Sequence, residues 1–294
     1  MIETPGVVLE RIVAAPGSRV VANVGQASQA TVDATGFPVR RLALEGISLF
    51  DFALPVARAA ADGRKICGVV AATFSNGERF PALAVRLAAA LGLPASTPAF
   101  DLQMACSAYP YALYLAGRLA ADTGGDVLVV DADLQSRFVD PDDAATALVM
   151  DDAATATVVS AGAGVSRFDF LSSCDVALAC PAQGPVAMDG FKVFSFVAMQ
   201  VARFLKPFGT DFEMFVPHRA NLYMIRRLAA SLALEDKLLA PEGCFANPGS
   251  ASIPLTLAAA ARPGRALVAG FGAGFSAAAG LVTLADGFKG EVIS

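Results

Sequence analysis

Short, mostly apolar runs alternate along the chain with longer stretches in which apolar residues recur every three or four positions. The short runs, rich in Val and Ala, predict buried β-strands, and the longer stretches predict helices. Strands are predicted at 66–73, 97–102, 126–133, 155–161, 213–216, 265–270 and 277–284. Helices are predicted at 81–91, 106–121, 190–204, 221–232 and 252–261. This alternation predicts an α/β protein whose sheets are covered by helices on both faces.

The predicted elements fall into two halves of similar length. Strands and helices alternate within residues 1–164, and the same alternation returns within residues 165–294. No stretch with the composition of a flexible linker separates the halves, so one compact unit is expected. The repetition suggests that the two halves are related by an internal pseudo-twofold axis.

One uncharged segment, residues 266–285, is long enough to cross a bilayer as a helix. Glycines interrupt it at Gly270, Gly272, Gly274 and Gly280. The segment divides naturally into two short apolar runs around a Gly-rich turn. We therefore expect two buried strands here and no membrane span.

Composition narrows the possible functions. Hydrophobic residues make up 55% of the 294 positions and charged residues 17%, which is enough apolar material for a large core. The formal net charge of −5 argues against a general nucleic-acid-binding protein, because such proteins normally present a basic face. The N-terminal residues include Glu3, Glu10 and Arg11 and lack the apolar core of a signal peptide.

Cysteine and histidine usage argues against a metal centre. The cysteines fit no zinc-binding spacing, and the chain has a single histidine. We expect reduced thiols in a cytoplasmic protein, most of them buried as small apolar side chains. The five cysteines are Cys67, Cys106, Cys174, Cys180 and Cys244.

Cys106 is the candidate nucleophile. It follows a predicted short strand and stands at the beginning of a predicted helix, within the sequence ACSAY at 105–109. At a helix N-terminus the helix dipole favours the thiolate, and free backbone N–H groups point toward the group that the sulfur attacks. A buried structural cysteine is the alternative interpretation.

Three turn segments carry the other candidate residues. His218 lies between a predicted strand and a predicted helix, so acid–base chemistry by imidazole would have to use it, although a lone histidine is often structural. Asn247 precedes Pro248-Gly249 in a turn, where an ordinary loop asparagine is the alternative. The sequence GFGAGF at 270–275 lacks the Lys-Ser/Thr of a P-loop and is followed by a predicted strand. We interpret it as a turn whose backbone N–H groups approach a ligand oxygen.

Taken in order, these segments resemble the ketosynthase III family of the thiolase superfamily, the β-ketoacyl-(acyl carrier protein) synthase III group. ACSAY is similar to its cysteine motif, VPHRAN at 216–221 to its VPHQAN motif, NPGSASIPL at 247–255 to its NTSAASIPL stretch, and GFGAGF to its oxyanion loop. The resemblance begins near Ala34 and runs to the C-terminus. It implies a thiolase-like, five-layered αβαβα fold made of two pseudo-twofold-related halves.

The resemblance implies a catalytic triad of Cys106, His218 and Asn247. Cys106 would take an acyl group from a thioester donor, and His218 and Asn247 would bind a malonyl thioester while it loses CO₂. The backbone N–H groups of Cys106 and Ala273 would form the oxyanion hole. Acyl and malonyl thioesters, carried by coenzyme A or by an acyl carrier protein, would be the substrates, with no resident cofactor and no metal.

A homodimer is also implied. Phe80 is similar to a family residue that reaches across the dimer interface and lines the acyl pocket of the partner. We expect Phe191 and Phe194 to help determine the size of that pocket. Acyl chain length and branching stay open at this stage.

The chain departs from the family where the adenine end of coenzyme A is held by a tryptophan and arginines. It has no tryptophan, and Ala144 stands where an arginine is usual. We hypothesise that the donor arrives on an acyl carrier protein or as a different small thioester. Arg219, Arg226 and Arg227 would then dock the acidic carrier, and a solvated helix face is the alternative for them.

Three functions follow from these features. The leading one is decarboxylating C–C condensation in fatty-acid-like or secondary metabolism. The second is an acyltransferase of the same fold, which would move an acyl group from Cys106 to an alcohol or amine. The third is a non-catalytic partner subunit of a heterodimeric ketosynthase, suggested by Asp152 where the family has glycine and by the missing coenzyme A contacts.

Overall fold

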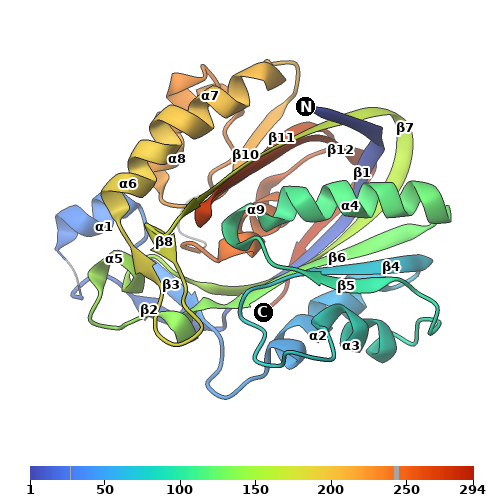
Figure 1. The fold of residues 1–294 in the computed structure, drawn as a ribbon, viewed down its shortest axis with the longest axis horizontal. Helices are drawn as coiled ribbons and strands as arrows, with labels where there is room; N and C mark the ends of the chain where they lie inside the picture. Colours follow the sequence, from blue (N-terminus) through green and yellow to red (C-terminus); the bar gives the residue numbers. More distant parts are fainter. Residues whose placement is uncertain (27, 242–244) are drawn as a thin grey trace.

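The protein has five alternating layers of helices and strands (Figure 1). The computed structural model describes residues 1–26, 28–241 and 245–294. Helices α4 (Ala108–Thr123) and α9 (Ser252–Ala260) lie in the middle, between two layers of sheet. Helices α2 (Leu49–Ala61) and α3 (Leu83–Ala90) cover one outer face, and α8 (Leu222–Ser231) with shorter helices covers the other. The predicted α/β, five-layered architecture is confirmed.

The main sheet has the strand order β10-β11-β12-β1-β7-β6-β4-β5. Its strands are β1 (Ile2–Pro16), β4 (Ile66–Ala72), β5 (Ala99–Leu102), β6 (Asp126–Leu134), β7 (Asp152–Asp175), β10 (Met214–Pro217), β11 (Gly264–Gly272) and β12 (Gly274–Val292). Two small hairpins add β2 (Arg19–Ala22) with β3 (Val39–Leu42), and β8 (Leu178–Ala179) with β9 (Ala187–Met188). The remaining helices of the described chain are α1 (Gln29–Thr35), α5 (Ala144–Ala147), α6 (Gly190–Ser195) and α7 (Ala202–Leu205).

Strand β7 belongs to both sheet layers. Its first part, 152–159, pairs antiparallel with β6, and its last part, 167–175, pairs antiparallel with β12. In the first half, the parallel pair β4–β6 is followed by β7, which is antiparallel to β6, and then by β1, which is antiparallel to β7. In the second half, the parallel pair β10–β11 is followed by β12, which is antiparallel to β11, and then by β7, which is antiparallel to β12. The division expected near residue 164 falls inside β7.

Burial follows the layers. Every residue from 252 to 258 in α9 is buried, as expected for a helix packed between two sheets. In α8, by contrast, Leu222, Ile225, Leu228 and Ala229 form a single buried face, as the sequence pattern predicts. The core therefore divides into three apolar clusters, one in the middle layer and one beneath each outer layer.

The predicted strands and helices are confirmed, with differences in length and number. Strand β1 and helix α2 were not expected, because Pro5, Glu10 and Arg11 break the apolar run of the strand and Pro55 lies inside the helix. The predicted helix 190–204 is α6 and α7 joined by a π-helical turn. Residues 266–285 form most of the β11–β12 hairpin, and no helix in the described chain is long and apolar enough to span a membrane.

Candidate active site

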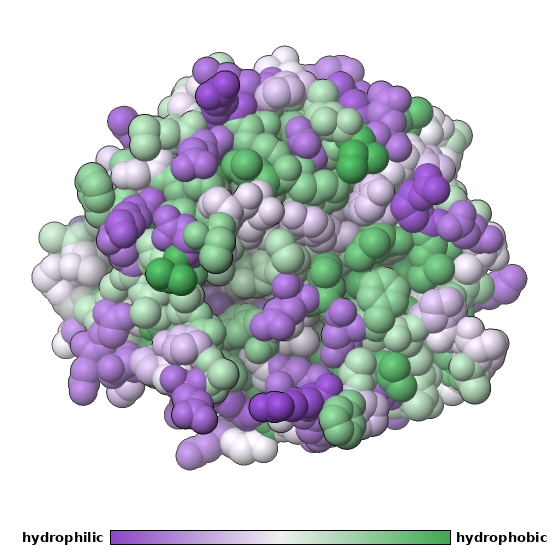
Figure 2. Space-filling model, in the orientation of Figure 1, coloured by the Kyte–Doolittle hydropathy of each residue, from purple (hydrophilic) through white to green (hydrophobic). Residues whose placement is uncertain are grey.

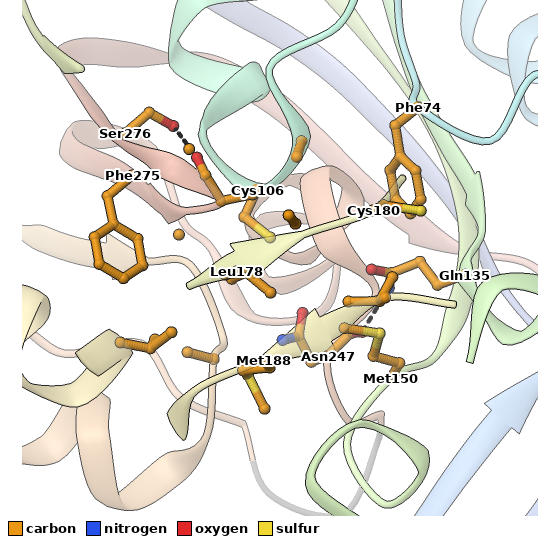
Figure 3. Close-up of a pocket in the computed structure, with 18 of the residues that line it drawn as sticks. Phe74, Cys106, Gln135, Met150, Leu178, Cys180, Met188, Asn247, Phe275 and Ser276 are labelled. Atoms are coloured by element: carbon orange, nitrogen blue, oxygen red, sulfur yellow. Dashed lines mark hydrogen bonds between the residues drawn. The ribbon is translucent and has the colours of Figure 1, made fainter. Parts of the chain in front are cut away.

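A cavity of about 970 Å³ brings the predicted catalytic residues together. Cys106, His218, Asn247 and Ala273 all line it, although they come from four separate segments. Figure 3 shows Cys106 and Asn247 on facing sides of the cavity, with Leu178 and Met188 along its wall. On the surface, apolar side chains surround a hollow near the position of β8 (Figure 2).

Local backbone geometry presents Cys106. A 3₁₀ turn, Ala105–Ser107, leads into α4, and Ala105 takes the left-handed conformation with φ 43°. Such a conformation is unusual for a residue with a side chain and marks a sharp turn immediately before the cysteine. Behind the turn, the Ser107 hydroxyl lies 2.7 Å from that of Ser276, and the Ser276 hydroxyl donates to the Ala273 carbonyl at 2.7 Å. These bonds join the cysteine turn to the Gly-rich loop.

Two glycines of GFGAGF, Gly270 and Gly272, lie in close contact with the turn that carries the cysteine. A Cβ atom added at Gly270 would lie 2.7 Å from the Cys106 carbonyl oxygen and 2.8 Å from the Ser107 Cα. A Cβ at Gly272, whose φ is +150°, would lie 3.2 Å from the Cys106 Cβ and 3.4 Å from its sulfur. The loop therefore packs directly against the nucleophile, which only residues without a side chain permit.

The thiol of Cys106 is uncharged at neutral pH. Burial raises its pKa to about 12, the negative charge of Asp133 adds to this effect, and backbone hydrogen bonds from Ala273 and from Cys106 itself oppose it. This raised pKa runs against the expectation that the helix N-terminus favours a thiolate, and desolvation is its largest cause. The same two backbone groups that reach the sulfur are those predicted to form the oxyanion hole.

His218 is buried with 2% of its surface exposed. Its Nδ1 lies 2.8 Å from the Ser252 hydroxyl, and its backbone N–H donates to the Ala269 carbonyl at 2.7 Å. Burial lowers the pKa of His218 to about 4, with a backbone hydrogen bond to Gly249 acting in the opposite direction. The imidazole is thus neutral near pH 7 and is fixed in orientation by its neighbours.

Hydrogen bonds hold Asn247 so that its side-chain NH₂ group stays free to face the cavity. Its Oδ1 accepts the Gly249 N–H at 3.0 Å, and its backbone carbonyl accepts the Asp151 N–H at 2.9 Å and the Gln135 side-chain amide at 2.8 Å. Because Oδ1 is occupied, the NH₂ of Asn247 is the group available to a ligand. Asn247 therefore offers an amide donor to the cavity that His218 also lines.

Several predicted site residues lie elsewhere. Arg219 is buried, with 1% exposed, and its guanidinium lies over the rings of Phe37 and Phe245, so it cannot form part of a docking surface. Phe191 is 80% exposed and does not line the cavity. Phe194 stacks on Tyr223 and also lies outside the lining. Arg219 therefore does not fit the docking prediction, and Phe191 and Phe194 do not fit the pocket prediction. The surroundings of these three side chains depend on contacts with distant segments, which local sequence pattern does not specify.

Sequence reasoning missed much of the cavity wall. Phe74, Phe138, Phe271 and Phe275 line it, together with Leu178 and Met188 of the small β8–β9 hairpin. Phe74, Phe138 and the hairpin lie in segments outside the predicted elements, so no periodic pattern could have identified them. Cys174 and Cys180 also line the cavity and are exposed, contrary to the expectation of buried thiols, and Cys244 lies outside the described residues.

Asp131 is a second buried acid on the same face of β6 as Asp133. It is fully buried, and within the described chain neither carboxylate oxygen has a hydrogen-bond partner. Burial raises the pKa of Asp131 well above its usual value, and the charge of Asp133 raises it further. The folded protein therefore holds a proton on this carboxyl group that the unfolded chain releases near pH 4.

Replacing Asp131 with asparagine should stabilise the protein at neutral pH. The pKa of Asp131 is raised in the folded state, so its contribution to the free energy of unfolding is complete below about pH 4. Above that pH, the contribution falls by about 1.4 kcal/mol per pH unit until the folded protein loses the proton. The introduced amide would mimic the protonated carboxyl at every pH. Urea unfolding at pH 4 and pH 7 should show equal stability at the lower pH and a more stable variant at the higher one. The exposed Asp122→Asn is the control, and a pH-independent difference for Asp131→Asn would refute this account.

Two family descriptions match the chain. The 3-oxoacyl-(acyl-carrier-protein) synthase III family matches residues 100–175, and the C-terminal family of the same synthase matches residues 209–284. The chain is 34% identical over 283 residues to a β-ketoacyl-(acyl-carrier-protein) synthase III of Laribacter hongkongensis, covering 83% of this chain and 87% of the relative. It is 33% identical over 251 residues to a Streptomyces coelicolor synthase III, covering 79% and 76%.

Solved structures agree with these matches. A 3-oxoacyl-(acyl-carrier protein) synthase from Burkholderia xenovorans LB400 superposes with a TM-score of 0.89 at 26% identity, covering 99% of this chain and 98% of that one. A 3-oxoacyl-(acyl carrier protein) synthase III from Pseudomonas aeruginosa PAO1 gives 0.85 at 28% identity, covering 95% and 98%. The priming β-ketosynthase of the R1128 polyketide pathway gives 0.85 at 25% identity, covering 96% and 97%. These likenesses confirm the thiolase-like fold.

Proposed function

The chain belongs to the 3-oxoacyl-(acyl carrier protein) synthase III family, and on this premise we propose that Cys106, His218 and Asn247 carry out its chemistry. It is a ketosynthase III-like condensing enzyme and hence an acyltransferase. The observation that carries the proposed roles is the convergence of the three side chains on one largely apolar cavity.

In the first half-reaction the sulfur of Cys106 attacks the carbonyl carbon of an acyl thioester. The donor thiol leaves with the proton of Cys106, and the acyl group stays on the enzyme as a new thioester. The backbone N–H groups of Cys106 and Ala273 stabilise the oxyanion that forms in between, and loss of one such donor typically costs about 3 kcal/mol of barrier. The high pKa of Cys106 means that the resting thiol loses its proton only as the sulfur attacks.

In the second half-reaction a malonyl thioester enters the same cavity. His218 and Asn247 donate hydrogen bonds to its thioester carbonyl, which stabilises the enolate left when the carboxylate departs as CO₂. The enolate carbon attacks the acyl-Cys106 carbonyl, forms the C–C bond and releases the Cys106 thiolate. A neutral His218 suits this role, because it donates without carrying a competing charge. Two half-reactions on one sulfur predict ping-pong kinetics.

The wild-type protein allows a direct test of these two half-reactions. Incubation with an acyl donor should add the acyl mass to Cys106, and later addition of malonyl carrier protein should release CO₂ and remove that mass. Peptide mapping is needed, because Cys174 and Cys180 open onto the same cavity. Adduct formation without malonyl-dependent CO₂ would instead favour acyl transfer to an alcohol or amine, and no adduct with any donor would favour the partner-subunit function.

We further propose that the donor arrives on an acyl carrier protein. Among the described residues that line the cavity none is Lys or Arg, and the one charged residue is Asp175. The nearby helix α1 carries Asp33, and Asp142 and Asp143 precede α5, so carboxylates lie beside the parts of these helices that line the cavity. The phosphates of coenzyme A would meet like charges there, whereas a carrier-bound donor brings only its phosphopantetheine arm to the cavity.

Arg226 and Arg227 are the remaining docking candidates. Both are exposed on α8, whose residues Asn221 and Met224 reach the cavity. Reversing both charges to glutamate should raise the KM for a carrier-bound donor about tenfold or more, because it removes attraction to an acidic partner. The KM for an acyl-pantetheine donor should stay unchanged. The control is Arg118→Glu, at an exposed position of helix α4. An unchanged KM for the carrier-bound donor in the variant with both charges reversed would exclude this docking surface.

We also propose that the protein forms a homodimer. Phe80 is 86% exposed and does not line the cavity of its own chain, and β5 stands at the edge of the main sheet. Three residues after Phe80, the Leu83 N–H donates to Asp101 of β5 at 2.8 Å, and an exposed large apolar side chain and an open sheet edge are each typical of an interface. Phe80 would then reach the acyl pocket of the partner. Light scattering should give twice the chain mass, and a monomer would exclude this role of Phe80.

A further inference from the structure

Asp133, at the end of β6, is a buried carboxylate for which the proposed mechanism has no direct use. It is fully buried, and its Oδ1 accepts hydrogen bonds from one short segment that follows β4. The Phe74 N–H donates at 3.0 Å, the Ser75 N–H at 3.2 Å, and the hydroxyls of Thr73 and Ser75 donate at 2.9 Å each. This segment places Phe74 in the cavity wall.

The other oxygen of Asp133 is bonded to a different part of the site. Its Oδ2 accepts the Ser250 hydroxyl at 3.2 Å, across 117 positions of sequence. Ser250 belongs to the turn that begins at Asn247, in which the Gly249 N–H bonds to the Asn247 side chain. One carboxylate thus connects the cavity wall at Phe74 with the turn that orients the Asn247 amide.

Gln135, which directly follows the last residue of β6, holds the same turn. Its side-chain amide donates to the backbone carbonyls of Asn247 and Asp151, each at 2.8 Å. A Cβ at Gly249 would come within 3.0 Å of the Gln135 side chain, so the turn lies directly on it. Asp133, near the end of β6, and Gln135, just after it, therefore both support the Asn247 turn.

The burial of Asp133 is unfavourable for folding. Desolvation raises its pKa to about 6 in spite of the hydrogen bonds that it accepts, so its charge near pH 7 opposes stability. That charge also raises the pKa of Cys106. A fully buried carboxylate that spans two walls of a reaction cavity is expected to be kept for geometry rather than for stability.

We propose that Asp133 is a positioning residue that fixes the Asn247 turn against the Phe74 wall, so that the condensation step depends on it more than the acylation step does. This inference rests on the proposed function, because it assigns Asn247 to the malonyl half-reaction. Asp133 touches neither substrate nor reacting atoms; it acts through Ser250 and Asn247. A displacement of a catalytic group by about 1 Å can lower a rate about a hundredfold.

The test compares Asp133→Asn with Ser250→Ala, which removes only the bond to the Asn247 turn. Asp152→Asn is the matched control, since Asp152 is also buried and accepts from Ala43 N–H and from Ser136 but holds no cavity residue. Single-turnover acylation of Cys106 should not fall by more than threefold in Asp133→Asn or in Ser250→Ala. Condensation with malonyl carrier protein should fall about tenfold or more in Asp133→Asn and severalfold in Ser250→Ala.

Alkylation by iodoacetamide gives a second readout that needs no substrate. Loss of the Asp133 charge should make Cys106 react faster at pH 8 in Asp133→Asn, while Ser250→Ala and Asp152→Asn should react like the wild type. Equal loss of acylation and condensation in Ser250→Ala, or unchanged condensation in that variant, would overturn the proposal. This test stands even where Asp133→Asn fails to fold. Wild-type protein that acylates but releases no CO₂ would overturn the proposed function and this inference with it.

Discussion

Replacing Cys106 with alanine should abolish the acyl adduct and lower condensation by at least about a thousandfold. In the proposed mechanism the sulfur of Cys106 carries the acyl group between the two half-reactions, and loss of a nucleophile in covalent catalysis typically has effects of this size or larger. Intact-mass measurement after incubation with an acyl donor checks the first half-reaction, and product formation from malonyl carrier protein checks the second.

The matched control for this experiment is Asn247→Ala. It should retain the adduct on Cys106, because the oxyanion hole is formed by the backbone of Cys106 and Ala273, and should lose malonyl-dependent CO₂ release. The two variants therefore divide the reaction at the acyl-enzyme. An adduct of the same mass and yield in Cys106→Ala would show that Cys174 or Cys180, which line the same cavity, carries the acyl group instead.

Replacing Gly272 with alanine should lower the acylation rate about tenfold to a hundredfold. The new Cβ would lie 3.2 Å from the Cys106 Cβ and 3.4 Å from its sulfur, so the thiol would have to move. A φ of +150° is also unfavourable for a residue with a side chain and should reduce the free energy of unfolding by about 1–3 kcal/mol. Stopped-flow acylation and urea unfolding measure the two effects separately.

Gly287→Ala provides the comparison, because a Cβ there meets no atom within 4 Å. It should leave both quantities close to those of the wild type. If Gly272→Ala acylated Cys106 at the wild-type rate, the loop would have room to move, and its contact with the nucleophile would not explain why glycine stands at this position.

The identity of the three candidate catalytic residues was accessible from sequence because each lies in a short segment with its own local pattern. Cys106 lies in the turn that leads into a helix, His218 follows a strand, and Asn247 precedes Pro-Gly in a turn. Periodicity also predicted α9 and the buried face of α8. Such features depend on neighbours within a few positions, which is the range over which sequence pattern determines backbone conformation.

Contacts between distant segments had to come from the folded structure. Arg219 follows His218 directly, yet it is buried against Phe37 and Phe245, while Arg226 on the same segment is exposed. The wall formed by Phe74 and the β8–β9 hairpin lies outside every predicted element. Which side chain faces a cavity depends on how layers pack, and local pattern carries little of that information.

The protonation states of Cys106 and His218 also depend on contacts that exist only in the folded structure. The sequence predicted a thiolate at Cys106 from the helix N-terminus, whereas burial and the charge of Asp133 keep the thiol protonated and burial keeps His218 neutral. The sequence by itself thus determined the fold class and which residues are candidates for the chemistry, because local propensity and motif order suffice for that. Only the tertiary structure decided their protonation, their orientation and the link through Asp133, since desolvation and hydrogen bonding across 117 positions exist only once the layers are packed.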